Sequence, residues 1–206
     1  MIPVQRKPPP AGFKIKVYDP GQKWLNDHGY PLHGPIPKDK NGKDEFDLFP
    51  YWRACLDDLH RRYRGVCAYV SIYIHRVTGA RSADHFIAKS TRIEHAYRWR
   101  NLRLASAKIN GRKGVFADIL DPFQIQPETF FLDLVTGEIY PNPGRPRDLQ
   151  DKARITIDRL GLDDAACRAA RAEYFDDYCK RDISDRHLRR MCPFVWYEVH
   201  RQKMTV

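Results

Sequence analysis

The chain has 206 residues, which is enough to bury a hydrophobic core without disulfides or a structural metal. It carries 36 Lys and Arg against 26 Asp and Glu, and this formal net charge of +10 favours a polyanionic partner. No apolar run approaches the length of a membrane span, so the composition excludes proteins that cross a bilayer through long apolar helices.

The five cysteines are scattered along the chain and include no CxxC pair. The first residues, MIPVQRKPPPAGF, lack the apolar stretch of a secretion signal. We therefore expect a cytoplasmic protein whose thiols are reduced and mostly buried in the core.

The predicted N-terminal segment, residues 1–64, combines an irregular arm with one helix. Prolines and glycines break up the first 50 residues, which predicts an arm that wraps its own domain or a partner. In residues 49–63, apolar side chains recur three and four positions apart, which predicts an amphipathic helix. His60 lies beside its apolar face, and we expect it to be a packing or surface residue.

A β-hairpin is predicted next. Residues 67–75 (CAYVSIYIH) are rich in β-forming side chains, and residues 81–87 (RSADHFI) are predicted to return as the second strand after a turn. This pairing would place Asp84 and His85 at the end of the hairpin.

The rest of the predicted middle segment, 65–124, follows this hairpin. Residues 101–105 predict another short strand, and residues 107–119 begin as a helix that Gly111 and Gly114 interrupt.

The predicted final segment, 125–206, is a hairpin followed by helices. The hairpin covers residues 129–140, and a helix end is expected at Gly161, with Asp163 or Asp164 capping the next helix. Together the elements predict the α+β class: a mostly helical domain that contains short hairpins and forms one compact unit.

The informative residues fall in one short region, as Asp84-His85, Lys89-Ser90, Asn101-Leu102 and Asn110-Gly111-Arg112-Lys113-Gly114. Each group is common by itself, because Asp-His pairs occur by chance and Asn-Gly is usually a turn. Their order and spacing are more specific. Lys89-Ser90 follows the histidine by four and five residues, and Asn101 and Asn110 are nine residues apart.

This arrangement resembles the HNH endonuclease family over about thirty residues. The resemblance implies a ββα-metal finger embedded in the helical domain and a nuclease that hydrolyses phosphodiester bonds, with DNA as the expected substrate. It also implies a single Mg²⁺ or Mn²⁺ ion as cofactor, since hard divalent ions prefer oxygen ligands.

The resemblance assigns a role to each matched residue. His85 is expected to be the general base that activates water. Asp84 and Asn110 are expected to bind the metal ion, which leaves positions for water and phosphate. Asn101 is expected to bond to backbone and hold the loop that orients His85. Adjacent strand residues point to opposite faces, so the strand must twist or end here for Asp84 and His85 to converge.

One departure from the family concerns zinc. Many members carry two CxxC pairs that flank the site, whereas this chain has only Cys67 near the first pair and Ala105 and Lys108 near the second. We therefore expect no structural zinc, with packing holding the finger together.

Basic side chains dominate the matched region. The expected phosphate contacts are Lys89, Arg103, Arg112 and Lys113. The aromatic residues Tyr97 and Trp99 are of a kind that stacks on bases, but such residues are more often part of a core.

Longer blocks of the chain, such as PYWRACLDDLH and RLGLDDAACRAAR, resemble a group of small bacterial HNH proteins. These include the nuclease subunit of Septu-type anti-phage systems, which implies an ATPase partner and a role in defence. The mixed charge and aromatics of the C-terminal region are compatible with a partner surface or a homo-oligomer. The alternative function is a non-catalytic nucleic-acid-binding or partner-docking subunit on the same scaffold.

Overall fold

The protein is a mixed α+β structure of short helices and two small antiparallel sheets, described over residues 1–206 in a computed structural model. The helices are α1 (Asp19–Asp27), α2 (Leu56–Arg62), α3 (Ala107–Lys113), α4 (Arg147–Leu160), α5 (Ala165–Cys179), α6 (Asp185–Met191) and α7 (Pro193–Arg201). The strands are β1 (Arg81–His85), β2 (Leu102–Ser106), β3 (Phe130–Leu132) and β4 (Ile139–Pro141). None of these helices combines the length and apolar character that crossing a bilayer requires.

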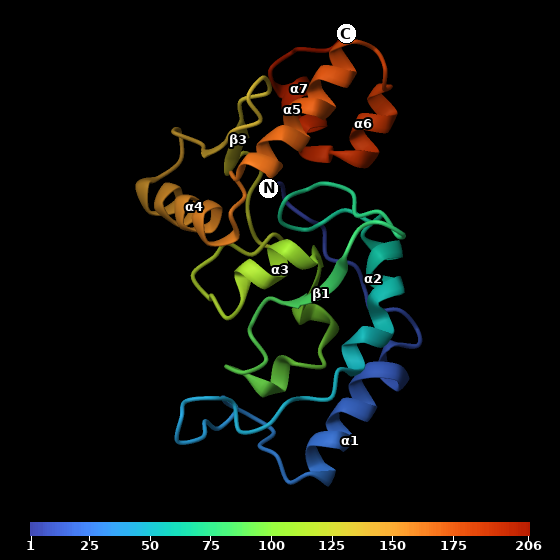
Figure 1. The fold of residues 1–206 in the computed structure, drawn as a ribbon, viewed down its shortest axis with the longest axis vertical. Coiled ribbons are helices and arrows are strands. Elements are labelled where there is room, and N and C mark those ends of the chain that lie inside the picture. The colour runs from blue at the N-terminus through green and yellow to red at the C-terminus, as the bar shows by residue number, and fades with distance from the viewer.

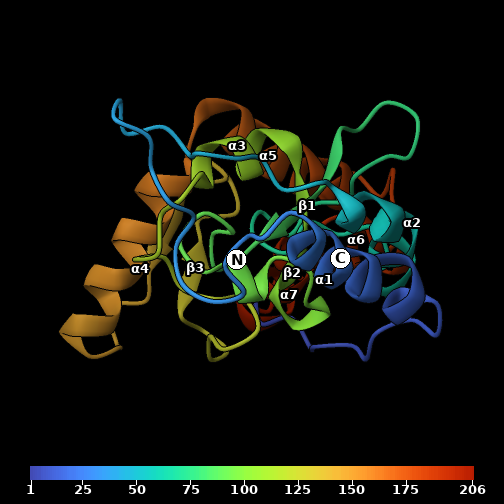
Figure 2. The ribbon, with the colours of Figure 1, turned by 90° about the horizontal axis from the view of Figure 1, so that it is seen from below.

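One hydrophobic cluster of 39 buried residues runs from Met1 to Val199, so the three predicted segments share a single core. Figure 1 shows α1 at one end of the long axis, the helices α5, α6 and α7 at the other end, and β1 with α3 between them. Seen from below, α4 projects from the side opposite α1 and α2 (Figure 2).

The prediction that the first 50 residues are irregular is wrong for residues 14–27. A π-helical turn, η1 (Lys14–Tyr18), leads directly into α1. Both segments are stabilised by burial, because Val17 of η1 and Leu25 of α1 are fully inaccessible to solvent. Gly21 allows the close approach of α1 to the core, since a Cβ atom there would lie 2.3 Å from Cγ of Tyr97.

The helix predicted at 49–63 is confirmed, but it begins as a 3₁₀ turn, η2 (Tyr51–Cys55), before continuing as α2. His60 is buried, and its Nε2 lies 2.8 Å from the carbonyl oxygen of Ile74, which it reaches as a donor. The expected packing role of His60 is therefore confirmed.

The predicted pairing of 67–75 with 81–87 is wrong, because β1 pairs with β2 instead. The register places Ala83 opposite Leu104 and His85 opposite Leu102. Residues 67–71 are buried at five consecutive positions, so this segment has no solvent face of the kind that an alternating strand has. It folds as a compact loop beside β2, with the Ala68 amide donating to the Leu104 carbonyl at 2.8 Å.

The predicted strand at 101–105 and the helix that follows it are confirmed as β2 and α3. Gly111 does not interrupt the helix, which continues to Lys113 and ends at Gly114 with φ +49°. The helix α3 packs against both β1 and β2.

The predicted elements of the C-terminal part are confirmed. Strands β3 and β4 form a hairpin, with Gly137 at φ +70° in its turn. The helix α4 ends at Gly161 in the left-handed conformation, and Asp164 caps α5 by accepting a hydrogen bond from the Cys167 amide at 2.7 Å.

Asp164 also ties α3 to the corner between α4 and α5. Its carboxylate lies 2.7 Å from Nζ of Lys108 and 2.8 Å from Nη1 of Arg112, and both of these residues belong to α3. Arg112 donates further to the Gly161 carbonyl at 3.0 Å. The short helix α3 is therefore held by charge-assisted contacts on the side away from β1.

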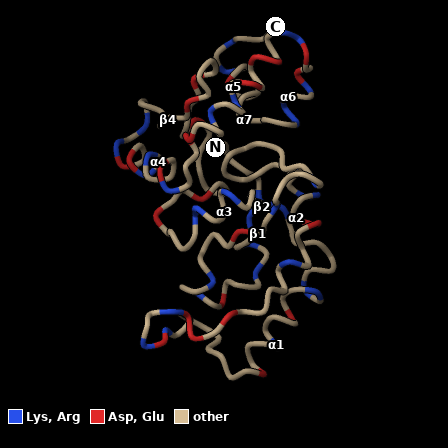
Figure 3. Tube along the Cα trace, in the orientation of Figure 1, with Lys and Arg blue, Asp and Glu red and all other residues tan.

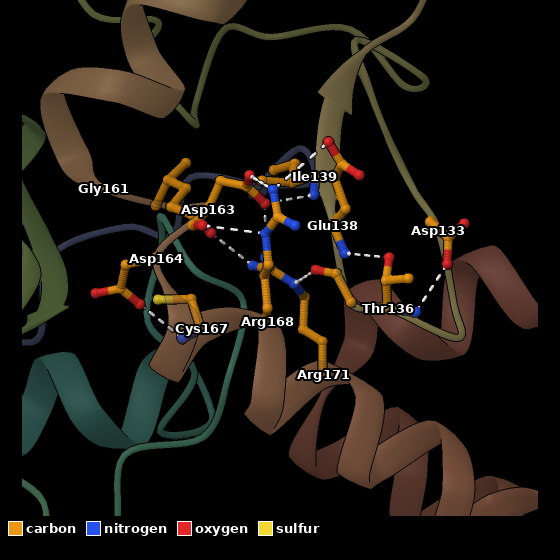
Figure 4. A network of polar contacts seen from close by, with 12 residues as sticks. Asp133, Thr136, Glu138, Ile139, Gly161, Asp163, Asp164, Cys167, Arg168 and Arg171 are labelled. Atoms are coloured by element: carbon orange, nitrogen blue, oxygen red, sulfur yellow. Dashed lines mark hydrogen bonds and ion pairs between the residues drawn. The ribbon is translucent and has the colours of Figure 1, made fainter.

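The neighbouring Asp163 extends this network to the β3–β4 hairpin, as Figure 4 shows. Its carboxylate accepts a hydrogen bond from the Ile139 amide at 3.0 Å and another from Arg168. Arg171 donates to the Gly137 carbonyl at 2.7 Å. The corner thus links α3, α5 and the hairpin into one unit.

We expect Asp164→Ala to lower the free energy of unfolding by about 2 kcal/mol, because it removes a helix cap and two partly buried charge pairs. The matched control is Asp151→Ala, whose carboxylate pairs with Arg154 on an exposed face of α4. That control should cost less than about 0.5 kcal/mol. Urea denaturation of both variants checks the difference, and equal losses would contradict it.

Candidate active site

Asp84 lies in a buried cluster with Tyr69 and Lys113. The Tyr69 hydroxyl donates to Oδ2 of Asp84, and Nζ of Lys113 lies 3.2 Å from Oδ1. Lys113 is fully buried and also donates to the His85 carbonyl at 2.7 Å. Burial raises the pKa of Asp84, whereas the Lys113 ammonium acts in the opposite direction. The cluster therefore neutralises the carboxylate inside the protein.

The arrangement of Asp84 does not fit a divalent cation as it stands. Each of its oxygens already faces a protein group, and the adjacent ammonium cancels the negative charge that would attract the ion. Asn110, the other expected ligand, lies half-buried on α3 and its side chain makes no hydrogen bond. No three His, Cys, Asp or Glu side chains gather in a way that could hold a metal ion. A cation could reach Asp84 only after Lys113 moved away.

His85, the last residue of β1, is held as a neutral imidazole. Its Nε2 lies 2.8 Å from the Ala96 carbonyl oxygen, which can only accept, so Nε2 carries the proton and Nδ1 is left with a free lone pair. Nδ1 has no hydrogen-bond partner and is not fully enclosed, although His85 as a whole is buried. Burial lowers the pKa of His85 to about 4. The ring is therefore available as a base at neutral pH.

Asp84 and His85 do not bond to one another. Strand β1 ends at His85, as the convergence of the two residues was expected to require. The Asp84 side chain nevertheless contacts Tyr69 and Lys113, while the His85 ring packs edge-on against Trp52 with 4.7 Å between ring centroids. The two side chains thus occupy neighbouring but separate environments.

Asn101 closes a loop of residues 86–101, which we call the site loop. Its side chain accepts a hydrogen bond from the Ile87 amide at 2.8 Å and donates to the Ile87 carbonyl at 2.9 Å. It also donates to the His95 carbonyl at 3.1 Å. His95 directly precedes Ala96, whose carbonyl accepts the hydrogen bond from Nε2 of His85. These are the backbone contacts that the sequence led us to expect of this residue.

Residues of the N-terminal arm are hydrogen-bonded to the site loop. The Ile36 amide donates to the Ser90 carbonyl at 2.8 Å, and the Ile93 amide donates to the Gly34 carbonyl at 2.9 Å. The Gly34 amide in turn donates to the Glu94 carboxylate at 3.1 Å. The loop that carries the His85 acceptor is therefore fixed at its base and along its length.

The structure gives three of the expected phosphate contacts other partners. Lys113 is buried against Asp84, and Arg103 forms a two-point ion pair with Asp121 in which the heavy atoms are 3.0 and 2.8 Å apart. Neither is free to meet a phosphate, so these two predictions need correction. Arg112 is half-buried and contacts Asp164, which leaves Lys89 as the expected contact without a carboxylate partner.

Two residues of the site escaped prediction. Tyr69 lies in a uniformly buried run, and Trp52 lies on η2 far from the matched region in sequence. Lys113 was expected to contact phosphate, but it pairs with Asp84. Its spacing from Asn110 could have indicated this. Lys113 follows Asn110 by three residues, so both share one face of the helix, and that face meets β1.

The two aromatic residues of the site loop are core residues. Tyr97 and Trp99 are buried, and each anchors a distant segment, because the Tyr97 hydroxyl donates to the Phe49 carbonyl and the Trp99 indole donates to the Lys7 carbonyl. The expectation that such residues more often pack than stack on bases is confirmed for both.

Comparison with known proteins adds no assignment: no protein-family model matches the chain, and no curated protein matches it significantly.

We expect Lys113→Met to lower the free energy of unfolding by about 3–5 kcal/mol at neutral pH, because it leaves a buried carboxylate without a counter-ion. The double variant Lys113→Met/Asp84→Asn should recover most of this loss, since it removes both charges of the pair. Guanidinium denaturation measures both variants. A single variant as stable as the wild type would show that the two groups do not interact as described.

A pH dependence follows from Glu94. Burial alone would raise the pKa of Glu94, but hydrogen bonds from its own amide, Arg92 and Gly34 lower it from 4.5 to about 2. Because the folded pKa is depressed, the stabilisation is complete above the unfolded pKa and is lost as the pH falls toward about 2.

The measurement compares wild type with Glu94→Gln by urea denaturation between neutral and acidic pH. The stability difference should be largest at neutral pH and shrink below about 4.5, where the unfolded chain takes up the proton first. A difference that stays constant with pH would contradict the ionic role of Glu94.

Proposed function

We propose that the chain is an HNH-type endonuclease that hydrolyses phosphodiester bonds in nucleic acid, with DNA as the expected substrate. The order of the strands and the helix that carry the matched residues supports this proposal. Asp84 and His85 end a strand, Asn101 directly precedes the antiparallel partner strand, and Asn110 lies on the helix that packs against both strands. This is the strand–strand–helix order in which the family places its site.

The observation that carries the proposal is the state of His85. Its Nε2 is committed to the Ala96 carbonyl, and the unprotonated Nδ1 has no hydrogen-bond partner and is not fully enclosed. His60 bonds a carbonyl in the same way, so His85 is distinguished by its position at the end of β1 and by its lowered pKa. Here the tautomer and the free Nδ1 suit a general base, and the lowered pKa keeps the ring unprotonated at neutral pH.

In the proposed reaction, a water molecule next to Nδ1 of His85 gives up a proton to that nitrogen while its oxygen attacks the phosphorus atom. The bond from phosphorus to the 3′ oxygen breaks, and the departing oxygen takes a proton from solvent. The Ala96 carbonyl stabilises the imidazolium that forms, because it accepts the Nε2 hydrogen bond throughout.

A divalent ion, Mg²⁺ or Mn²⁺, is the cofactor that the resemblance implies, and when bound it would neutralise charge on the phosphate. Asp84 and Asn110 are the oxygen donors proposed for it. The contact between Asp84 and Lys113 opposes such binding in the arrangement described here, and no step of the proposal depends on it.

That same contact favours a second candidate function, a non-catalytic nucleic-acid-binding module on the same scaffold. A binding protein needs no open metal position, and an internal Asp84–Lys113 pair would serve it as a purely structural element. The two candidates differ in whether His85 affects cleavage.

The test is incubation of supercoiled plasmid with wild type and with His85→Gln, in Mg²⁺, in Mn²⁺ and in EDTA. Glutamine retains an amide donor for the Ala96 carbonyl but lacks a basic nitrogen. We expect plasmid nicking by the wild type and a loss of roughly 10²–10⁴-fold in the variant.

The control variant is His187→Ala, at an exposed position on α6. It should nick at the wild-type rate. Wild-type and His85→Gln proteins that bind DNA but leave the plasmid intact would favour the binding module, while equal nicking by both would exclude His85 as the base.

A further inference from the structure

The basic residues of the matched region fall into two groups that the sequence does not distinguish. Five have a carboxylate within ion-pairing distance, namely Arg92, Arg103, Lys108, Arg112 and Lys113. The remaining three, Lys89, Arg98 and Arg100, have no carboxylate partner and donate no side-chain hydrogen bond. All three unpaired cations lie on the site loop.

Lys89 is the unpaired cation with the most direct link to His85. Its Nζ lies 5.7 Å from the ring centroid of Trp52, and the ring of Trp52 packs against the ring of His85. An ammonium held over an indole face keeps its donors directed outward.

Arg98 and Arg100 follow the His85 acceptor, Ala96, along the site loop. They lie two and four residues after Ala96, and Arg100 is exposed. Both contribute, after burial, to the low pKa of His95, whose carbonyl is bonded by Asn101. Arg98 and Arg100 are therefore near enough to act electrostatically on His95, the residue before Ala96.

The site loop holds these cations in place before any ligand arrives. Asn101 closes the loop at its base, and the arm residues Gly34 and Ile36 bond to it along its length. Charged side chains on a fixed backbone lose less entropy when they meet a phosphate than side chains on a mobile loop.

We propose that Lys89, Arg98 and Arg100 form the phosphate-binding surface of the protein, and that the partner is the sugar–phosphate backbone of a nucleic acid laid across the site loop. The proposal rests on the proposed nuclease function and replaces Arg103, Arg112 and Lys113 as the contacts. Guanidinium groups suit phosphate through paired N–H donors, whereas Lys89 acts as a point charge beside His85.

The overall charge does not by itself select this surface. Lys and Arg are interspersed with Asp and Glu along most of the trace, as Figure 3 shows. Exposed cations without a carboxylate partner also occur far from the site loop in sequence, for example Lys40, Arg186 and Lys203. These three provide a control set with the same charge change.

The experiment measures DNA binding by fluorescence anisotropy at several salt concentrations, in a His85→Gln background so that the probe is not cut. One variant carries Lys89→Gln, Arg98→Gln and Arg100→Gln, and the control carries Lys40→Gln, Arg186→Gln and Lys203→Gln. The probe is a fluorescent DNA duplex, and circular dichroism melting verifies that both triple variants fold.

Each phosphate contact contributes about 0.9 to the magnitude of the slope of the log binding constant against log salt concentration for duplex DNA. The slope for the site-loop variant should therefore be smaller in magnitude by about 2.7. The control should lose less than about 1. Equal losses in the two variants would overturn the proposal while leaving the nuclease function standing. If the His85→Gln parent binds no DNA although the wild type nicks plasmid, the phosphate-surface proposal is also overturned. If the parent does not bind DNA and the wild type does not nick plasmid, both this proposal and the nuclease function are overturned.

Discussion

The buried pair of Asp84 and Lys113 is the constraint on which the rest of the site depends. Lys113 bonds both to the carboxylate and to the His85 carbonyl, so one ammonium fastens the C-terminal turn of α3 to the end of β1. A second face of α3 is fastened by Asp164, and the helix therefore cannot shift without breaking charged contacts on one face or the other. The same pair takes Asp84 out of reach of a cation and removes Lys113 from the surface.

Much of the fold follows from local signals in the sequence. The β3–β4 hairpin, the end of α4 at Gly161 and the cap of α5 at Asp164 all depend on residues that are close together in the chain. Strand pairing was predicted less well, because β1 joins β2 across the site loop instead of the adjacent run at 67–75. That choice depends on which segment is buried on both faces, which is a property of the whole core.

The candidate site shows the same division. Local spacing singled out Asp84, His85, Asn101 and Asn110 as candidates, and the backbone contacts of Asn101 are those expected of it. The partners of the basic residues could not be predicted, because Asp121 and Asp164 meet Arg103 and α3 only through tertiary structure. Eight cations in one region therefore resemble a phosphate-binding surface in sequence, although most of them neutralise buried or partly buried carboxylates.

The account depends most on the state of His85, because the proposed chemistry needs a neutral ring with its proton on Nε2. The direct measurement is a ¹⁵N NMR spectrum of protein labelled at histidine, with the His85 signals assigned by their loss in His85→Gln. At neutral pH we expect a protonated Nε2 and an unprotonated Nδ1 for this residue. A proton on Nδ1, or an imidazolium that persists at neutral pH, would contradict the assignment of His85 as the general base.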